Sequence, residues 1–263
     1  MKRMVFIFFV FVLLGVVMMA ATAAISKKVY LPMIVNGRMG TMPVSTLTPT
    51  QTKTPSSTPT PSSTPTQTPI PTPDVEVLDN YKAVVDNSGF FHLYGEVENN
   101  TPNNLEQVRV MVNLLDDQFQ IVNSGWADTW LDILPANDRT CFHFITVDAP
   151  GSKYFQISQV EYFGTSASLP KFLVSFERSY RYPPPQVTIN GWIYNTIMSS
   201  RVEYVSPVVT LYNSIDNVIG CEFTFIEGYH LDPDQIGTFE LYYDWPFPDQ
   251  VTNLRVQVGG TIP

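Results

Sequence analysis

The chain has 263 residues, with 15 Lys+Arg against 24 Asp+Glu, a formal net charge of -9, 22 Pro, 14 Gly and only 2 Cys. This length allows one large domain or two small ones, and the acidic balance argues against nucleic acid as a partner, because that binding needs clustered Lys and Arg. Two cysteines exclude a disulfide scaffold and a Cys-rich metal site.

Residues 1–24 have the pattern of a secretory signal peptide. Two basic residues precede an unbroken apolar run over 4–20, and small residues follow, so cleavage is expected near Ala23 or Ala24. The run also approaches the roughly 20 residues that span a bilayer, which leaves an uncleaved membrane anchor as the alternative. In both cases the rest of the chain is exported. We therefore expect an extracytoplasmic protein, secreted or tethered at the cell surface, that meets a membrane only through this segment.

A short connecting segment, 25–42, leads into a stretch of unusual composition. From 43 to 73 most residues are Thr, Pro or Ser, and a single lysine carries the only charge. Such a stretch buries too little apolar surface to offset the loss of chain entropy on folding. The composition therefore predicts a disordered stalk over 43–73.

From residue 74 onward the sequence indicates strands, and its second half repeats the first. Short alternating or apolar runs are broken by Asn, Asp, Gly and Pro, which is typical of an all-β chain. The run at 89–97 aligns with the run at 187–195, so that Gly95 matches Gly191 and Asn99 matches Asn195. Two copies of about seven short strands each predict tandem β-sandwiches, which we place at 74–167 and 168–263.

One motif in each copy carries a family resemblance. Residues 112–116 read VNLLD and residues 209–213 read VTLYN, each after a Gly-x-Val/Ile-x-Asn pattern and before a polar turn. This arrangement resembles the FxLYD domain, an immunoglobulin-like sandwich of bacterial and archaeal surface proteins that often occurs in tandem. Val replaces the leading Phe in both copies, and Leu115 and Asn213 also differ from the family pattern. The resemblance implies fold and location, and no activity.

The sequence contains no pattern that predicts catalysis. No Gly-x-Ser-x-Gly, Gly-x-Gly-x-x-Gly or Walker-type loop is present. Cys141 and His143 lie two residues apart on one strand face, about 7 Å along a strand, which is too far for direct proton transfer. We therefore expect no enzyme, no catalytic residue and no cofactor.

Two groups of residues have side chains of the kinds that bind metals. His92 and His143, together with Glu96 or Asp148, have the residue types of a two-His-one-carboxylate centre, but ordinary strand positions are favoured. The acidic groups, Asp116-Asp117, Asp232-Pro233-Asp234, Asp244 and Asp249, lack calcium-loop spacing and suit turns. We expect no metal.

The two cysteines allow a disulfide between the copies. Cys141 aligns with Phe239 in the repeat and Cys221 lies near Asn123, so the cysteines occupy different positions in different copies. Because exported cysteines often pair, a Cys141–Cys221 bridge would lock the two domains together. The alternative is a pair of buried, reduced cysteines.

Aromatic residues give the only indication of a ligand. Trp126 and Trp130 flank an acidic turn, and copy two has Phe223, Phe225 and Tyr229 in the same region. Tyr182 and Trp245 belong to a second group, at the domain junction and near the end of the chain. Rings beside carboxylates and amides stack on sugars, whereas core packing is the alternative role. The candidate ligand-binding residues are Trp126, Trp130, Tyr182 and Trp245.

These observations predict a non-catalytic surface module that displays or spaces a protein-binding face, for adhesion or scaffolding, on a flexible stalk. The alternative is a carbohydrate-binding module that recognises cell-wall or extracellular polysaccharide through surface aromatics. The expected partner is thus a protein or an extracellular glycan, and not a nucleic acid.

Overall fold

The computed structural model describes residues 31–32, 34–35, 38–39, 73–147, 151–182, 185–244 and 246–263. Every regular element in these ranges is a strand, except the 3-10 turn η1 (Pro248–Gln250), so the predicted all-β class is confirmed. Across these ranges we find no helix with the length and apolarity to cross a bilayer. The expected signal segment, its cleavage site at Ala23 or Ala24, and the stalk up to residue 72 lie outside the described residues.

Short strands occur in the segment that was expected only to connect. They are β1 (Leu31–Pro32), β2 (Ile34–Val35) and β3 (Arg38–Met39). β2 and β3 pair with each other, and β1 pairs with strand β11 (Tyr154–Thr165). A strand of two residues is too short for the period-two pattern to be recognised in a sequence.

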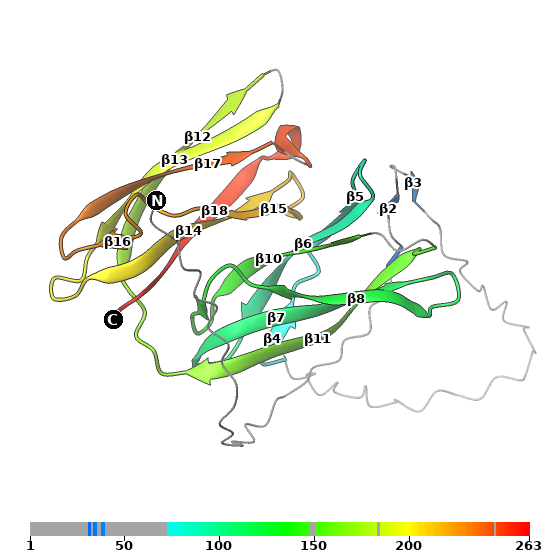
Figure 1. Cartoon of the computed structure of the whole chain (residues 1–263), viewed down its shortest axis with the longest axis horizontal. Coiled ribbons are helices and arrows are strands. Elements are labelled where there is room, and N and C mark those ends of the chain that lie inside the picture. The colour runs from blue at the N-terminus through cyan, green and yellow to red at the C-terminus, as the bar shows by residue number, and fades with distance from the viewer. Residues whose placement is uncertain are drawn as a thin grey trace, which may run out of the picture.

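Sandwich 1 consists of two antiparallel sheets (Figure 1). One sheet has the order β11, β7 (Asn104–Leu115), β8 (Ile121–Asp128), with β9 (Ile133–Leu134) also paired to β7. The other has the order β10 (Arg139–Val147), β6 (Phe90–Asn99), β4 (Val75–Val77), with β5 (Lys82–Val85) also paired to β6. Alternate residues of β6, such as Leu93 and Val97, lie in the core between the sheets.

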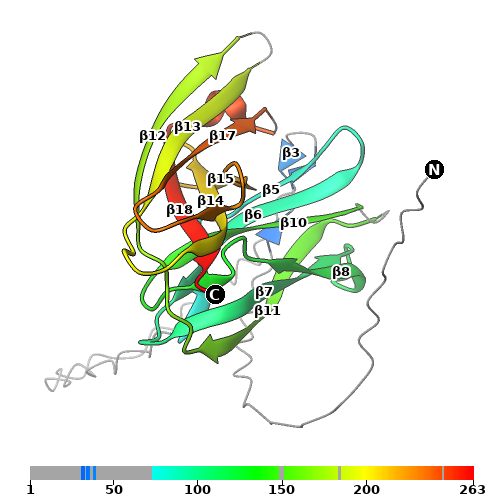
Figure 2. The ribbon, with the colours of Figure 1, turned by 60° about the vertical axis from the view of Figure 1, so that its left-hand side comes forward.

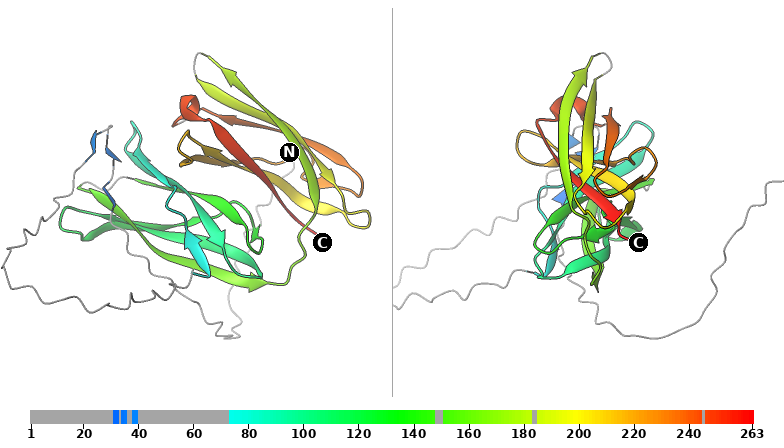
Figure 3. Two further views of the ribbon diagram at one scale, coloured as in Figure 1. Left: turned by 180° about the vertical axis from the view of Figure 1, so that it is seen from behind. Right: turned by 90° about the vertical axis from the view of Figure 1, so that its left-hand side faces the viewer.

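Sandwich 2 repeats this arrangement. Its first sheet has the order β12 (Phe172–Arg181), β13 (Gln186–Asn195), β17 (Ile236–Tyr243). Its second has the order β15 (Val218–Phe223), β14 (Val202–Tyr212), β16 (His230–Leu231), with β18 (Asn253–Thr261) also paired to β14. The prediction of two tandem sandwiches is confirmed, and Figure 3 shows them from two further sides.

A buried asparagine explains one repeated position. The side-chain amide of Asn99 donates to three backbone carbonyls, and that of Asn195 does the same at the equivalent place in sandwich 2. Their side-chain oxygens accept from the backbone N–H of Thr101 and of Ile197. Both asparagines are fully buried, and each ties the loop after its own strand to the end of a short strand, β9 or β16.

A repeated glycine corrects one detail of the predicted alignment. Gly95 pairs with Phe142 across β6 and β10, and Gly191 pairs with Phe239 across β13 and β17. A Cβ at either glycine would approach the phenylalanine ring to 2.7 Å or 2.6 Å, so only glycine fits beneath the ring. Phe142, and not Cys141, is therefore the counterpart of Phe239. Cys141 points to the opposite face of the sheet.

Candidate functional site

The two sandwiches pack face to face at a junction that contains the disulfide. The sheet with β6 and β10 lies against the sheet with β14 and β15 (Figure 2). Cys141 on β10 and Cys221 on β15 form a bridge with a Cα–Cα distance of 5.8 Å. The structure thus contains the bridge rather than two reduced cysteines, and Cys141 has no free thiol beside His143.

The carboxylate of Glu96 lies fully buried in this junction. One oxygen, Oε1, accepts from the Tyr212 hydroxyl at 2.7 Å and lies 3.2 Å from Nη2 of Arg255. The other, Oε2, accepts from the side-chain amide of Asn80 at 2.7 Å, and Nε of Arg139 lies 3.5 Å from Oε1. Because Tyr212 and Arg255 belong to sandwich 2, this one buried charge connects both domains.

Further bonds extend the junction on the same side. Nη2 of Arg255 also donates to the carbonyl of Arg139, and the amide of Gln257 donates to that carbonyl at 2.8 Å. At another point of the junction, the backbone N–H of Val218 donates to the Asn80 carbonyl at 2.7 Å. Together with the disulfide, these contacts hold the sandwiches in one arrangement.

The two histidines of sandwich 1 meet in the junction as well. Nδ1 of His92 lies 3.0 Å from Nε2 of His143, and the His143 ring stacks on Tyr94 with centroids 4.2 Å apart. Burial lowers the pKa of His143 to about 4, and it lowers the pKa of His92 although Asp86 opposes the shift. The imidazoles are therefore neutral at pH 7.

Neither metal interpretation gains support from the geometry. Among the described residues, no group of three or more His, Cys, Asp or Glu side chains is placed to hold a metal ion. Glu96 is engaged with Tyr212 and Arg255, and Asp148 lies outside the described ranges. Asp116 serves a turn, since its Oδ1 accepts from the backbone N–H of Gln118 and of Gln120.

An exposed row of aromatic rings crosses the junction. We call Trp130, Phe223, Phe225 and Tyr229 the aromatic row. Trp130 of sandwich 1 stacks on Phe223 of sandwich 2 with centroids 4.4 Å apart. Edge-on contacts then join Phe223 to Phe225 at 5.6 Å and Phe225 to Tyr229 at 5.2 Å. The exposed fractions along the row are 36%, 37%, 42% and 58%. These rings lie on the surface, and not in either core.

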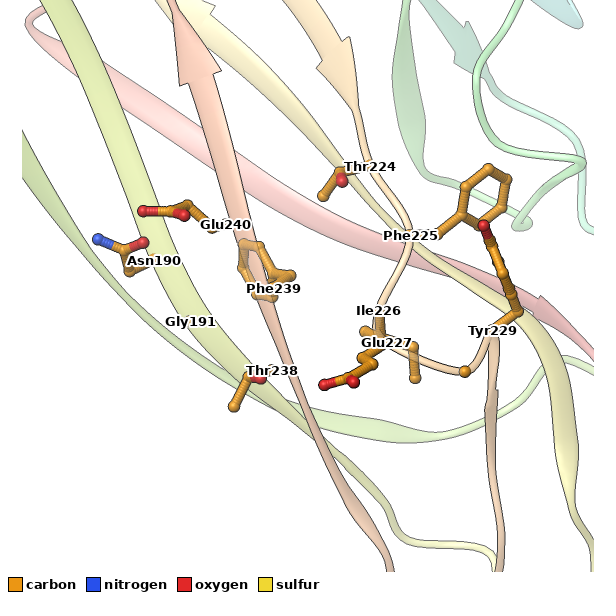
Figure 4. A pocket seen from close by; sticks show the side chains of 11 residues that line it. Asn190, Gly191, Thr224, Phe225, Ile226, Glu227, Tyr229, Thr238, Phe239 and Glu240 are labelled. Atoms are coloured by element: carbon orange, nitrogen blue, oxygen red, sulfur yellow. The ribbon is translucent and has the colours of Figure 1, made fainter.

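A hollow of about 870 Å³ adjoins the end of the row. Its lining includes Phe225 and Tyr229 on one side, and Asn190 and Glu240 side by side on the facing strands β13 and β17 (Figure 4). A second hollow, of about 500 Å³, shares Asn190 and Glu240 and continues to Tyr180, Arg181, Tyr182 and Tyr242. We call the two hollows together the groove.

The structure separates the four candidate residues. Trp130 belongs to the aromatic row, and Tyr182 is 67% exposed at the far end of the groove. Trp126 lies elsewhere, with the Arg109 guanidinium 4.6 Å from its ring centre, and no ring contact joins it to Trp130 in the described ranges. Trp245 lies outside the described residues. Of the four candidates, Trp130 and Tyr182 are thus the two that the structure places along the aromatic row and the groove.

The polar lining of the groove was not predicted. Asn190, Thr238 and Glu240 alternate with core residues along β13 and β17, so they point outward as any exposed strand residues do. Glu227 lies in the loop after β15 beside the aromatic row. A weak signal existed in the sequence, because Phe223, Phe225 and Tyr229 surround Glu227 within a few residues.

Comparisons with known proteins do not assign the chain to a family. No protein-family model and no curated protein matches it. Among solved structures, it aligns with the crystal structure of a red sea bream transglutaminase at 12% identity and a TM-score of 0.23. The alignment covers 72% of this chain and 29% of that one, so the chain spans less than a third of the transglutaminase. A likeness of this size carries no argument about function.

Proposed function

We propose that the protein is a non-catalytic extracytoplasmic module that presents a binding face on an N-terminal stalk. The observation that carries the proposal is the aromatic row, four exposed rings in continuous contact beside a groove. Contiguous apolar surface of this kind is costly to expose to water and marks interaction sites. Aromatic side chains also supply a large contact area with few rotatable bonds, which favours affinity.

The junction supports the proposal because it fixes the parts of the face relative to one another. Trp130 comes from sandwich 1 and the other three rings from sandwich 2. The Cys141–Cys221 bridge and the buried Glu96 hold both domains in this arrangement before any ligand arrives. Binding then loses less entropy than it would between two mobile domains.

The location outside the cytoplasm rests on the N-terminal sequence and on the FxLYD resemblance. The Cys141–Cys221 bridge agrees with that location, because structural disulfides persist in oxidising compartments. A non-catalytic role agrees with the surroundings of the cysteine and histidine side chains. Cys141 is bridged, and His92 and His143 are buried against each other at the junction rather than in the groove.

The experiment is a retention assay on isolated bacterial cell envelopes. The purified full chain, held in mild detergent, is incubated with envelopes, and the retained fraction is measured against concentration. The double variant Phe225→Ala/Tyr229→Ala removes two rings and is expected to weaken retention at least tenfold, about 1.4 kcal/mol. Trp126→Ala, a ring outside the row, is the matched control and should bind as the wild type does. Equal retention of all three proteins would contradict the proposal.

A further inference from the structure

We infer that the groove binds a linear glycan of neutral or amino sugars, running from the aromatic row towards Tyr182. This inference rests on the proposed function and adds the chemical class of the ligand. The two hollows share Asn190 and Glu240, so they form one continuous path across the outer face of β13 and β17. A long path with side chains along its whole length suits an extended, chain-shaped ligand better than a compact one.

Aromatic rings lie at both ends of this path. Phe225 and Tyr229 line the first hollow, and Tyr182 and Tyr242 line the second. All four are exposed, by 42% to 67% of their surface. A sugar ring has C–H faces that pack on an aromatic ring and a rim of hydroxyls that needs polar partners. Two pairs of aromatic side chains separated by polar groups therefore suit a polymer in which sugar rings repeat.

The middle of the path supplies the polar partners. Asn190 offers an amide that donates and accepts, Thr238 a hydroxyl that does both, and Glu240 a carboxylate that accepts. The Glu240 carboxylate also interacts with the Tyr242 hydroxyl, and this interaction raises the pKa of that hydroxyl. A few fixed polar groups between apolar surfaces are the usual composition of a small-molecule site.

Charge selects among glycans. Glu227 and Glu240 place two carboxylates in the first hollow, whereas Arg181, in the second, is the one cationic side chain that lines either hollow. The whole chain carries a net charge of -9. An acidic polysaccharide would be repelled by both, while neutral hydroxyls and protonated amino groups find acceptors.

An extended peptide is the competing occupant. β17 is the last strand of its sheet order, β12-β13-β17, and its outer edge borders the groove. A peptide that added to this edge would bind through backbone hydrogen bonds, so its affinity would depend mainly on the edge and less on distant rings. The tyrosines at the far end of the path, including Tyr182, would contribute nothing to that mode.

The test measures binding of the purified full chain to a defined panel by calorimetry. The probes are a neutral β-glucan, a mannan, hexamers and dimers of N-acetylglucosamine and of glucosamine, and alginate as the polyanion. We expect affinity for a neutral or amino glycan and none for alginate. Tyr229→Ala should weaken binding at least tenfold, and Tyr182→Ala should weaken binding of hexamers at least threefold but not of dimers. Trp126→Ala should change neither, and unaltered thermal unfolding shows that each variant folds.

The outcomes separate this inference from the proposed function. In parallel, envelopes are treated with periodate, which cleaves sugar diols, or with protease, before the retention assay. Loss of ring-dependent retention after periodate supports the glycan. Loss after protease alone, or preference for alginate, overturns the inference of a neutral or amino glycan and leaves the proposed binding module intact. Failure of every probe and every envelope to show ring-dependent binding overturns both.

Discussion

Glu96→Ala should loosen the junction between the sandwiches. The change removes a fully buried carboxylate that accepts from the Tyr212 hydroxyl at 2.7 Å and pairs with Arg255 at 3.2 Å. It leaves the hydroxyl without its acceptor and the guanidinium without its nearest charge. Removing one partner of a buried pair costs about 3–5 kcal/mol, because the remaining charge loses its compensation without regaining water.

The exposure of Arg255 and Arg139 decides where the cost of Glu96→Ala lies within this range of about 3–5 kcal/mol. Arg255 is 25% exposed and Arg139 is 41% exposed, so water recovers part of the lost interaction for both. Arg255 also keeps Asp138 at 3.5 Å. The buried hydroxyl of Tyr212 cannot regain a hydrogen bond to water in the same way. Its lost acceptor contributes about 1–3 kcal/mol to the destabilisation. We therefore expect the free energy of unfolding to fall by about 3 kcal/mol.

Urea denaturation of the full chain, with its disulfide intact, measures this change. The matched control is Glu98→Ala, which removes a part-exposed carboxylate two residues along the same strand and should cost less than about 0.5 kcal/mol. Glu96→Gln should lie between the two, since its amide oxygen still accepts from Tyr212. A Glu96→Ala variant as stable as Glu98→Ala would refute the reasoning that this carboxylate holds the domains together.

Three further predictions concern stability. Replacing Cys141 and Cys221 with serine opens a link between residues 80 apart, which should cost about 4 kcal/mol in the chain-entropy model, measured by urea titration against the wild type; an unchanged midpoint would contradict it. Burial lowers the pKa of His143 to about 4, whereas burial and Asp244 raise that of Glu222 to about 7, so their effects on stability oppose each other between pH 4.5 and 6.5. In Glu222→Gln the unfolded-state His143 gains a proton below pH 6.5 that the folded protein does not bind, and His92, whose pKa burial also lowers, acts in the same direction. Stability should therefore fall by about 2 kcal/mol from pH 7 to pH 5, and a flat profile of stability against pH would contradict the prediction. Asn195→Ala removes the donor to three backbone carbonyls and should lower the melting temperature, with a loss of about 1–3 kcal/mol; no shift in a calorimetric scan would contradict its role in joining these segments.

The sandwiches were predictable because their signals are local and occur twice. Alternation with period two indicates strands, and Asn99 with Asn195 set the repeat to the correct register. The junction was not predictable. Tyr94 and Glu96 alternate with core residues as surface residues would, and they are buried only because the second sandwich covers them. The sequence pattern of one sandwich does not indicate which face of that sandwich another domain covers.

The site was predictable only in part, for a similar reason. Trp130 was recognised as a ligand candidate, but its ring partner Phe223 comes from the other sandwich. Asn190 and Glu240 become neighbours through the pairing of β13 with β17, and each alone is an ordinary polar strand residue. Aromatic type is visible in a sequence, whereas convergence of polar groups from separate strands requires the fold.

The most direct measurement compares one ring from each sandwich. The central claim is that a single binding face is built from both domains, so Trp130→Ala in sandwich 1 and Tyr229→Ala in sandwich 2 should each weaken retention on cell envelopes at least tenfold, with Trp126→Ala unchanged. All four full-length proteins, wild type included, are titrated on one envelope preparation. Loss of binding in both row variants is the predicted result. Wild-type affinity in either of them would contradict a face shared by the two sandwiches.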